Sequence, residues 1–257
     1  MAHKYIKNME IQSGYEGVVY SGERLVDGLP VALKVQKSEN CEMCKTCCGG
    51  EVPQEVCMLK KARGVPGVIT LHDSYKSSKN QWTLVLERPV PCCDLFDVID
   101  SCERIDEQAA KNLFRQIYHT VFELSERNIA HGDLKVENVL VNMATYETRI
   151  IDFGMASHFT EDEITHFKGT RVFATPEYLE RKSYKWEDHE VWTLGHLLYN
   201  ILHGYDAFDG QSEIIHGQLK TSAKLSKEVT DLLHGCLKKD PEKRMKLKDI
   251  GEHEWLL

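Results

Sequence analysis

The residues with the clearest chemical potential lie in the stretch IAHGDLKVEN, residues 129–138. Asp133 can accept a proton, Lys135 can neutralise negative charge, and Asn138 offers an amide oxygen. A second carboxylate, Asp152, follows an apolar segment in IIDFG. Phosphoryl transfer needs a carboxylate that accepts a hydroxyl proton and hard oxygen ligands for Mg²⁺. The set fits that chemistry, although each residue alone is more often a loop or capping residue.

A lysine and a glycine-rich turn near the N-terminus could bind phosphate. Lys34 stands in the apolar segment VALKV, where its charge needs an anion, and Glu55 on the next helical segment could supply it. Gly14 and Gly17 in IQSGYEGVVYSG allow backbone N–H groups to approach phosphates. The simpler alternatives are a snorkelling lysine on an edge strand and an ordinary hairpin turn.

Length and composition limit the classes of protein. The 257 residues suit one large domain or two small lobes. A net charge of −8 argues against nucleic-acid binding and favours cationic partners, or serves solubility alone. No apolar run approaches the ~20 residues of a membrane span, and because the stretch MAHKYIKNME has no apolar core we expect no secretory signal in it. Nine cysteines, an odd number, favour a reducing compartment, so we expect the cytosol, with the nucleus also open.

The elements that must position these residues change character along the chain. Segments 16–25 and 29–36 read as strands joined by a DG turn, 52–62 reads as a helix, and 67–75 and 81–87 read as further strands. From Asp94 onward the pattern is helical: 107–127 carries a core-facing stripe, and 189–204 reads as a buried helix ending at Gly204. We therefore predict an α+β fold with two lobes, 1–88 and 89–257, hinged at 87–91 around a ligand-binding cleft.

In chain order, the motifs are SGxxGxV, VALK, a helix glutamate, HGDLKVEN, DFG and ATPE, the last at 174–177. Their spacing matches the signature set of the protein kinases, so the chain resembles that family over its whole length. VPQEVCMLKKA, LERPVPCCDLFDVI, GTRVFATPEY and VWTLGHLLYNILHG resemble the Pim family of Ser/Thr kinases from about Met9 onward. The resemblance implies the bilobal kinase fold, with ATP and Mg²⁺ as cofactors.

The resemblance also implies roles for individual residues. Asp133, Lys135 and Thr170 would act on the reacting groups, the Lys34–Glu55 pair would hold the phosphates, and Asn138 and Asp152 would bind Mg²⁺. Pro89 would remove one hinge hydrogen bond to adenine, because proline has no N–H. The residues expected to bind ATP are Ile11, Gln12, Ser13, Gly14, Gly17, Val19, Ala32, Lys34, Leu86, Glu87, Leu140 and Ile151.

The same resemblance bears on the substrate. Lys135 and Thr170 are the residues that Ser/Thr kinases carry at these two places, where tyrosine kinases differ. Asp94, Asp97 and Glu137 match acidic positions through which Pim kinases favour basic peptides, whereas Val136 departs from the family's aspartate. We therefore expect a monomer that acts on protein substrates with basic motifs, without nucleic-acid or membrane partners. Asp94 could equally be a helix N-cap.

Several positions depart from the kinase pattern. Gln12 replaces the first glycine of the loop, and Gly132 replaces an arginine that in most kinases pairs with a phosphorylated activation-segment residue. We expect activity without that phosphorylation; the alternative is a pseudokinase that binds nucleotide or partners as a scaffold. Glu190 stands where many kinases carry an aspartate that braces the catalytic loop. Glu177 and Arg244 match the partners of a buried salt bridge.

A cysteine-rich loop precedes the predicted helix. Cys41, Cys44, Cys47 and Cys48 have CxxC spacing, which suggests zinc or redox chemistry, but a short loop of this kind is more simply flexible. Three further cysteines fall in helical patterns and are expected to pack inside: Cys57, Cys102 and Cys236.

Overall fold

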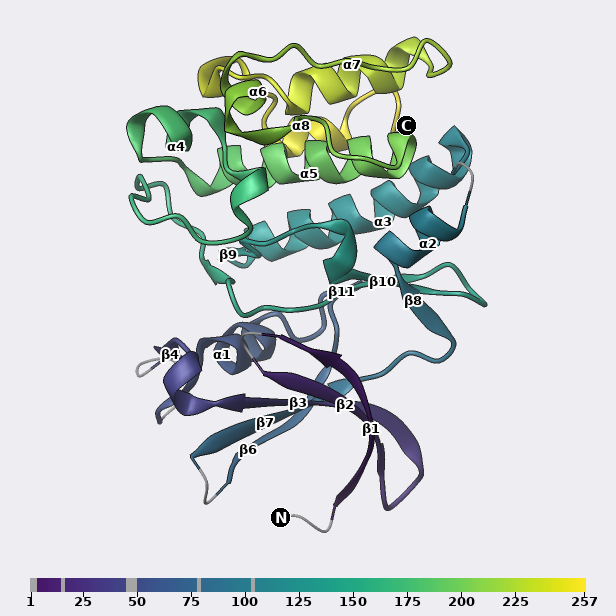
Figure 1. Cartoon of the computed structure of the whole chain (residues 1–257), viewed down its shortest axis with the longest axis vertical. Coiled ribbons are helices and arrows are strands. Elements are labelled where there is room, and N and C mark those ends of the chain that lie inside the picture. The colour runs from purple at the N-terminus through teal and green to yellow at the C-terminus, as the bar shows by residue number, and fades with distance from the viewer. Residues whose placement is uncertain (1–3, 15–16, 45–49, 78–79, 103–104) are drawn as a thin grey trace.

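The computed structural model describes residues 4–14, 17–44, 50–77, 80–102 and 105–257. A β-sheet with the N-terminus forms one end of the molecule, and helices with the C-terminus form the other (Figure 1). The predicted α+β fold is confirmed. The last strand of the sheet ends at Glu87, and the first helix of the helical part begins at Leu95.

One antiparallel sheet forms the N-terminal part, with strand order β1-β2-β3-β7-β6. The predicted hairpin over the DG turn is present between β2 and β3. β6 begins four residues later than expected, because turns hold the chain between Ala62 and Val68. The five strands are β1 (Tyr5–Ser13), β2 (Val18–Arg24), β3 (Leu29–Lys37), β6 (Leu71–Lys76) and β7 (Gln81–Glu87).

The pairing register decides which side chains share a face of this sheet. Lys34 lies opposite Val19 on one side and Leu84 on the other. Ala32 lies opposite Leu86 one pleat further along. Because side chains alternate along a strand, these residues share a face, and Leu84 and Leu86 belong to the main hydrophobic core. A separate small cluster of Val31, Leu33 and Val85 covers the other face.

The helices follow their sequence signals. In α3 every residue of the predicted apolar stripe is buried, and Asp106 caps the helix by accepting from Gln108 N and Ala109 N. In α5 nearly every residue is buried, and Gly204 ends the helix in the left-handed conformation, as predicted. The helices are α1 (Gln54–Lys61), α2 (Leu95–Ser101), α3 (Glu107–Glu126), α4 (Pro176–Arg181), α5 (Trp186–His203), α6 (Gly210–His216), α7 (Lys227–Cys236) and α8 (Leu247–Gly251).

Short strands between the sheet and the helices hold two loops that carry the candidate site. The strands form the sheet β11-β10-β8 and the pairs β12–β9 and β4–β5. One loop, 131–138, joins β9 to β10, and the other, 151–156, joins β11 to β12. The bounds are β4 (Met43–Cys44), β5 (Val52–Pro53), β8 (Cys92–Asp94), β9 (Ile129–Ala130), β10 (Val139–Asn142), β11 (Thr148–Ile150) and β12 (Ser157–His158).

Two further observations concern the described part of the chain. None of its helices combines the length and the apolar run needed to cross a membrane. Cys57 and Cys236 are buried as expected, but Cys102 is exposed. The packing prediction is wrong for Cys102 because α2 ends at Ser101 and the following residue turns out of the helix.

Candidate active site

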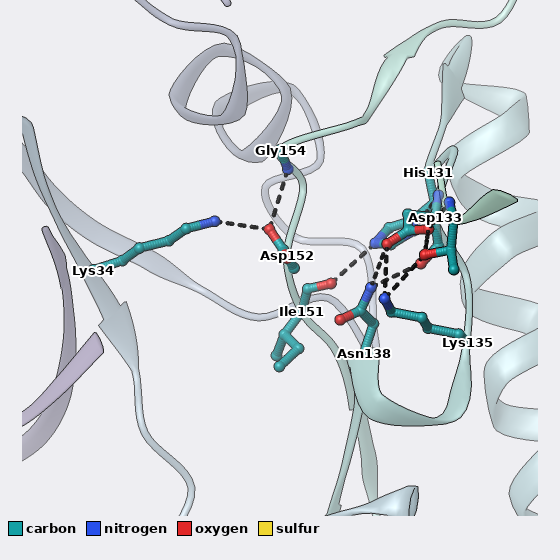
Figure 2. A network of polar contacts seen from close by, with 9 residues as sticks. Lys34, His131, Asp133, Lys135, Asn138, Ile151, Asp152 and Gly154 are labelled. Atoms are coloured by element: carbon teal, nitrogen blue, oxygen red, sulfur yellow. Dashed lines mark hydrogen bonds and ion pairs between the residues drawn. The ribbon is translucent and has the colours of Figure 1, made fainter. Parts of the chain in front are cut away.

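Asp133, Lys135 and Thr170 form one hydrogen-bonded group. Figure 2 shows how Asp133 and Lys135 of this group lie relative to Asn138. Asp133 Oδ1 accepts from the Thr170 hydroxyl at 2.6 Å and from Thr170 N at 2.7 Å. Lys135 Nζ donates to Thr170 Oγ1 at 3.0 Å and lies 3.3 Å from Asp133 Oδ2. Asn138 Nδ2 donates to the Asp133 carbonyl at 2.8 Å. The structure therefore brings together four of the residues that the sequence singled out.

Lys34 forms a second group with two carboxylates. Its Nζ lies 2.9 and 3.0 Å from the two oxygens of Glu55, so the predicted pair is present. The same Nζ lies 2.7 Å from Asp152 Oδ1, which Figure 2 shows reaching toward the lysine from the opposite loop. Burial raises the pKa of Asp152, but the charge and hydrogen bond of Lys34 outweigh it and hold that pKa below its ordinary value. The carboxylate is therefore ionised near neutral pH.

The donor atoms at Asn138 and Asp152 fit a magnesium ion. Asp152 has φ = 60°, an unusual backbone conformation for a residue with a side chain, which such sites often hold. Asn138 turns its amide nitrogen toward Asp133 and its oxygen the other way (Figure 2). One amide oxygen and one carboxylate are the hard donors that Mg²⁺ accepts beside phosphate oxygens and water. The residues present thus fit the ion that the sequence implied.

His131 supports both loops. It is fully buried and packs edge-on against Phe153, as a packing residue would. It also connects the loops: Nδ1 accepts from Asp133 N at 3.3 Å, and Nε2 lies 3.0 Å from the Ile151 carbonyl, to which it donates. Burial lowers the pKa of His131, in agreement with a neutral ring that accepts at one nitrogen and donates at the other.

Gly132 occupies a place where an L-residue is strained. Its φ is +78°, and a Cβ there would lie 2.7 Å from the Met155 carbonyl oxygen. Its N–H donates to Glu190 Oε1 at 3.0 Å, so the side chain of this α5 residue helps to hold the loop in place. The glycine therefore relaxes the backbone beside Asp133, and restoring an arginine would add strain as well as charge.

Glu190 makes a pH-dependent contribution to stability. Burial raises its pKa to about 7 from an ordinary value of 4.5, and the neighbouring His189, whose pKa burial lowers to about 4, supplies no positive charge. The folded protein therefore keeps a proton that the unfolded chain releases. This stabilisation is complete below pH 4.5 and is lost as the pH rises through 7.

We expect Glu190→Gln to flatten that dependence, because glutamine keeps a neutral acceptor for Gly132 N. Between pH 5 and pH 8 the variant should gain about 2 kcal/mol in unfolding free energy relative to the wild type, measured by urea denaturation at each pH. Glu180→Gln, at an exposed position, is the control and should show no such gain. Parallel curves for Glu190→Gln and the wild type would show that Glu190 does not titrate in this range.

The residues predicted to bind the nucleotide lie around Lys34. Val19, Ala32 and Leu86 share its face of the sheet, and Leu140 and Ile151 pack against the same core from the opposite side. A Cβ at Gly17 would collide with the Val35 carbonyl, so the loop needs a glycine there. Among the described loop residues, four are exposed: Ile11, Gln12, Ser13 and Gly14. The structure groups these positions as expected, and their nucleotide contacts stay predictions.

Glu87 differs from the other nucleotide positions. Its carboxylate pairs with Arg149 at 3.3 Å and accepts from Thr70 N at 3.0 Å. Both carboxylate oxygens are therefore engaged outside the group around Lys34, and the Glu87 N–H is engaged too, because it donates to the Thr70 carbonyl at 2.8 Å; a nucleotide contact would have to use the Glu87 carbonyl. Glu87 and Arg149 also line a pocket of about 760 Å³ whose other lining residues lie between Leu59 and Ser74, and neither Lys34 nor Asp133 lines it. We place the chemistry at Asp133 and Lys34 because the reactive groups converge there.

The three acidic residues expected to bind substrate lie in or beside the loop 131–138, and their contacts with a substrate stay predictions. Asp94 stands opposite Leu140 in the β8–β10 pairing, and α2 packs against the turn that contains Glu137. Asp94 is the N-cap of α2, accepting from Asp97 N at 2.7 Å, so the capping alternative is confirmed, whereas a role in substrate binding stays a prediction. Asp97 and Glu137 are exposed, whereas Val136 is buried. A peptide could meet the exposed carboxylates but not Val136.

The cysteine-rich loop gives no support for a metal site. Cys47 and Cys48 lie outside the described residues. Among the residues that are described, no group of three or more His, Cys, Asp or Glu side chains could hold a metal ion. Cys41 and Cys44 are both partly exposed.

Two charged residues near the site, Glu42 and Lys168, were not predicted from the sequence. Glu42 Oε2 lies 2.7 Å from Lys168 Nζ, 126 positions apart in the chain. A pairing between residues so distant leaves no periodic or spacing signal in a single sequence. Lys168 could have been noticed only because it stands two residues before Thr170.

Comparison with known proteins agrees with this geometry. A model of the protein kinase domain matches residues 5–256. The serine/threonine-protein kinase prk-2 of Caenorhabditis elegans is 38% identical over 261 residues, which cover 98% of this chain and 59% of prk-2. The serine/threonine-protein kinase pim-2 of Danio rerio is 31% identical over 263 residues, covering 99% of this chain and 85% of pim-2. The chain therefore belongs to the protein kinase family, with serine/threonine kinases as its relatives.

Proposed function

We propose that the protein is an ATP-dependent Ser/Thr kinase that transfers the γ-phosphoryl group to hydroxyls in basic peptides. The observation that carries the proposal is the joint presence of two groups: Asp133 with Lys135 and Thr170, and Lys34 with Glu55 and Asp152. A scaffold that only bound partners would need neither group. We further propose that residues 1–88 and 89–257 act as the two lobes and hinge at 87–91.

Each residue has a role that its surroundings support. Asp133, held by Thr170, accepts the proton of the substrate hydroxyl, and Lys135 neutralises charge on the transferring group. Lys34, oriented by Glu55, holds the nucleotide phosphates. Asn138 and Asp152 would hold Mg²⁺, which supplies charge neutralisation at the phosphates when bound. The protein's own contribution is thus to fix the hydroxyl, the phosphates and the charges around them.

Activity without activation-segment phosphorylation is part of the proposal. In most kinases the residue at this place is an arginine that pairs with a phosphate on the activation segment. Here the residue is Gly132, whose N–H donates to Glu190 Oε1. The segment between Asp152 and Thr170 is held by fixed contacts: Ala156 O accepts from Gln54 Nε2 at 2.8 Å, and His158 lies 3.0 Å from Lys61 Nζ. These contacts need no phosphate. We also propose a monomer in the cytosol or nucleus.

The proposal is tested by presenting phosphatase-treated protein with a positional Ser/Thr peptide library, ATP and Mg²⁺. We expect phosphorylation with Arg or Lys favoured upstream of the acceptor, and none with Asp152→Asn. Equal signals from the two proteins would point to a nucleotide-binding scaffold instead. Activity that disappears after phosphatase treatment would overturn the phosphorylation-independent part alone.

Reversing one exposed acidic side chain should change the substrate preference selectively. Asp97→Lys places a positive charge on α2, which packs against the turn that contains Glu137. On a basic peptide kcat/KM should fall about tenfold, and on a neutral peptide it should fall little, because like charges across an interface repel. Asp100→Lys, one turn further along α2 and also exposed, is the matched control. An equal loss on both peptides would indicate damage to the fold.

A further inference from the structure

Three contacts connect the region before and within α1 to the segment that follows Asp152. Glu42 pairs with Lys168 at 2.7 Å, Gln54 Nε2 donates to the Ala156 carbonyl at 2.8 Å, and Lys61 Nζ lies 3.0 Å from His158 Nε2. α1 lies between the sheet and the helical part (Figure 1), so these contacts join the two. Of the three, only the Glu42–Lys168 contact joins opposite charges.

Glu42 is held firmly on the side of the sheet. Its carbonyl accepts from Gln54 N at 2.8 Å, directly before Glu55, the partner of Lys34. The next residue, Met43, pairs with Pro53 in the β4–β5 ladder. A displacement of the Glu42 backbone would therefore be transmitted to the first turn of α1 and to the Lys34–Glu55 pair.

On the other side, Lys168 is linked to Asp133 through the two residues that follow it. Its backbone N–H lies 3.5 Å from the Tyr184 hydroxyl. Gly169 follows with φ = +107°, and its backbone touches the Gly132 carbonyl so closely that a Cβ would collide with it. Thr170 comes next and donates twice to Asp133. The position of Lys168 is therefore coupled over two residues to the carboxylate that accepts the proton.

We propose that Glu42 is a positioning residue whose ion pair with Lys168 holds Thr170 against Asp133 and Glu55 against Lys34 without phosphorylation. The Glu42 carboxylate supplies, without any modification, the negative charge that a phosphate would otherwise bring to the activation segment. Gly132 offers no guanidinium to a phosphate, whereas Lys168, two residues before Thr170, already has a carboxylate partner in Glu42. The inference rests on the proposed kinase function and names how that site is kept in order.

The effect of removing the pair should be moderate, because the Glu42 side chain is 55% exposed and the Lys168 side chain 26%. We expect Glu42→Gln and Lys168→Gln each to lower kcat about fivefold, which corresponds to about 1 kcal/mol, with little change in KM for ATP. The charge-swapped protein, Glu42→Lys with Lys168→Glu, should recover most of kcat. Glu39→Gln is the matched control: Glu39 lies in the same loop and pairs locally with Lys37 at 3.5 Å.

A second measurement does not depend on catalysis. Amide hydrogen exchange in residues 164–170 should accelerate in both single Gln variants, return toward the wild-type rate in the swapped protein and stay unchanged in Glu39→Gln. Unchanged exchange in Glu42→Gln, or a swapped protein no better than the single variants, would overturn the inference. If the wild type phosphorylates no peptide, the proposed function fails, whereas the exchange measurement still decides whether the pair orders the segment.

Discussion

Asp133→Asn should lower kcat by about 10²–10⁴-fold, the range that a positioned proton acceptor contributes. Asparagine has nearly the same shape, and its carbonyl oxygen can still accept from the Thr170 hydroxyl and N–H, which donate at 2.6 and 2.7 Å in the wild type. Its amide, however, cannot take a proton from the substrate hydroxyl. It would also place N–H donors where Lys135 Nζ now lies 3.3 Å from a carboxylate oxygen.

The loss should be confined to the chemical step. In the proposed site Lys34 and Asp152 hold the phosphates and the metal ion, and neither is changed, so the Kd of a fluorescent ATP analogue should remain close to the wild-type value. Asp152→Asn provides the contrast, because it should weaken nucleotide binding in the presence of Mg²⁺ as well as kcat. An Asp133→Asn protein with wild-type kcat would show that another group accepts the proton and that the Asp133 group is only structural.

The sequence predicted the reactive groups well because their positions follow from short-range chemistry. Lys34 had to lie in a strand whose neighbours are apolar, and a lysine in that setting needs a carboxylate such as Glu55. Asp133 and Asn138 lie in one loop, so their spacing alone brought them together. The helix ending at Gly204 and the stripe of α3 were predictable for the same reason, since caps and 3.6-residue periodicity are local signals.

What the sequence could not predict depends on long-range geometry. From the sequence, Gly132 could be interpreted only as the loss of a phosphate-pairing arginine, because nothing in the sequence shows that this backbone adopts φ = +78° beside the Met155 carbonyl. Cys102 looked like a core residue because the apolar pattern does not show where α2 ends. Glu42 and Lys168 were missed because two surface charges acquire a meaning only when the fold places them 2.7 Å apart.

The buried Arg244 should be the most sensitive stability determinant of the helical part. It pairs with Glu177 through two hydrogen bonds of 2.8 Å, and both side chains are almost completely inaccessible. The guanidinium also donates to the carbonyls of Lys238, Asp188 and Lys239, so every one of its nitrogen atoms is engaged. An ammonium group cannot reproduce this planar, five-donor arrangement.

Arg244→Lys should therefore destabilise the protein although it conserves the charge. Breaking a buried pair costs about 3–5 kcal/mol, which for a domain of this size lowers Tm by about 6–20 °C in calorimetry. The comparison variant, Lys246→Met, removes ion pairs of 3.3 Å with Asp188 and 3.9 Å with Glu187, both in α5. Because the Lys246 side chain is 45% exposed, its loss should cost under about 1 kcal/mol of unfolding free energy. The two variants separate the effect of burial from the effect of charge. If Arg244→Lys lowered Tm as little as Lys246→Met does, the new lysine would be able to replace the hydrogen bonds of the guanidinium, and the site would not require a planar group. Because Arg244 lies outside the reacting groups, kcat of the variant measured well below its Tm should stay near the wild-type value, the opposite of the result expected for Asp133→Asn.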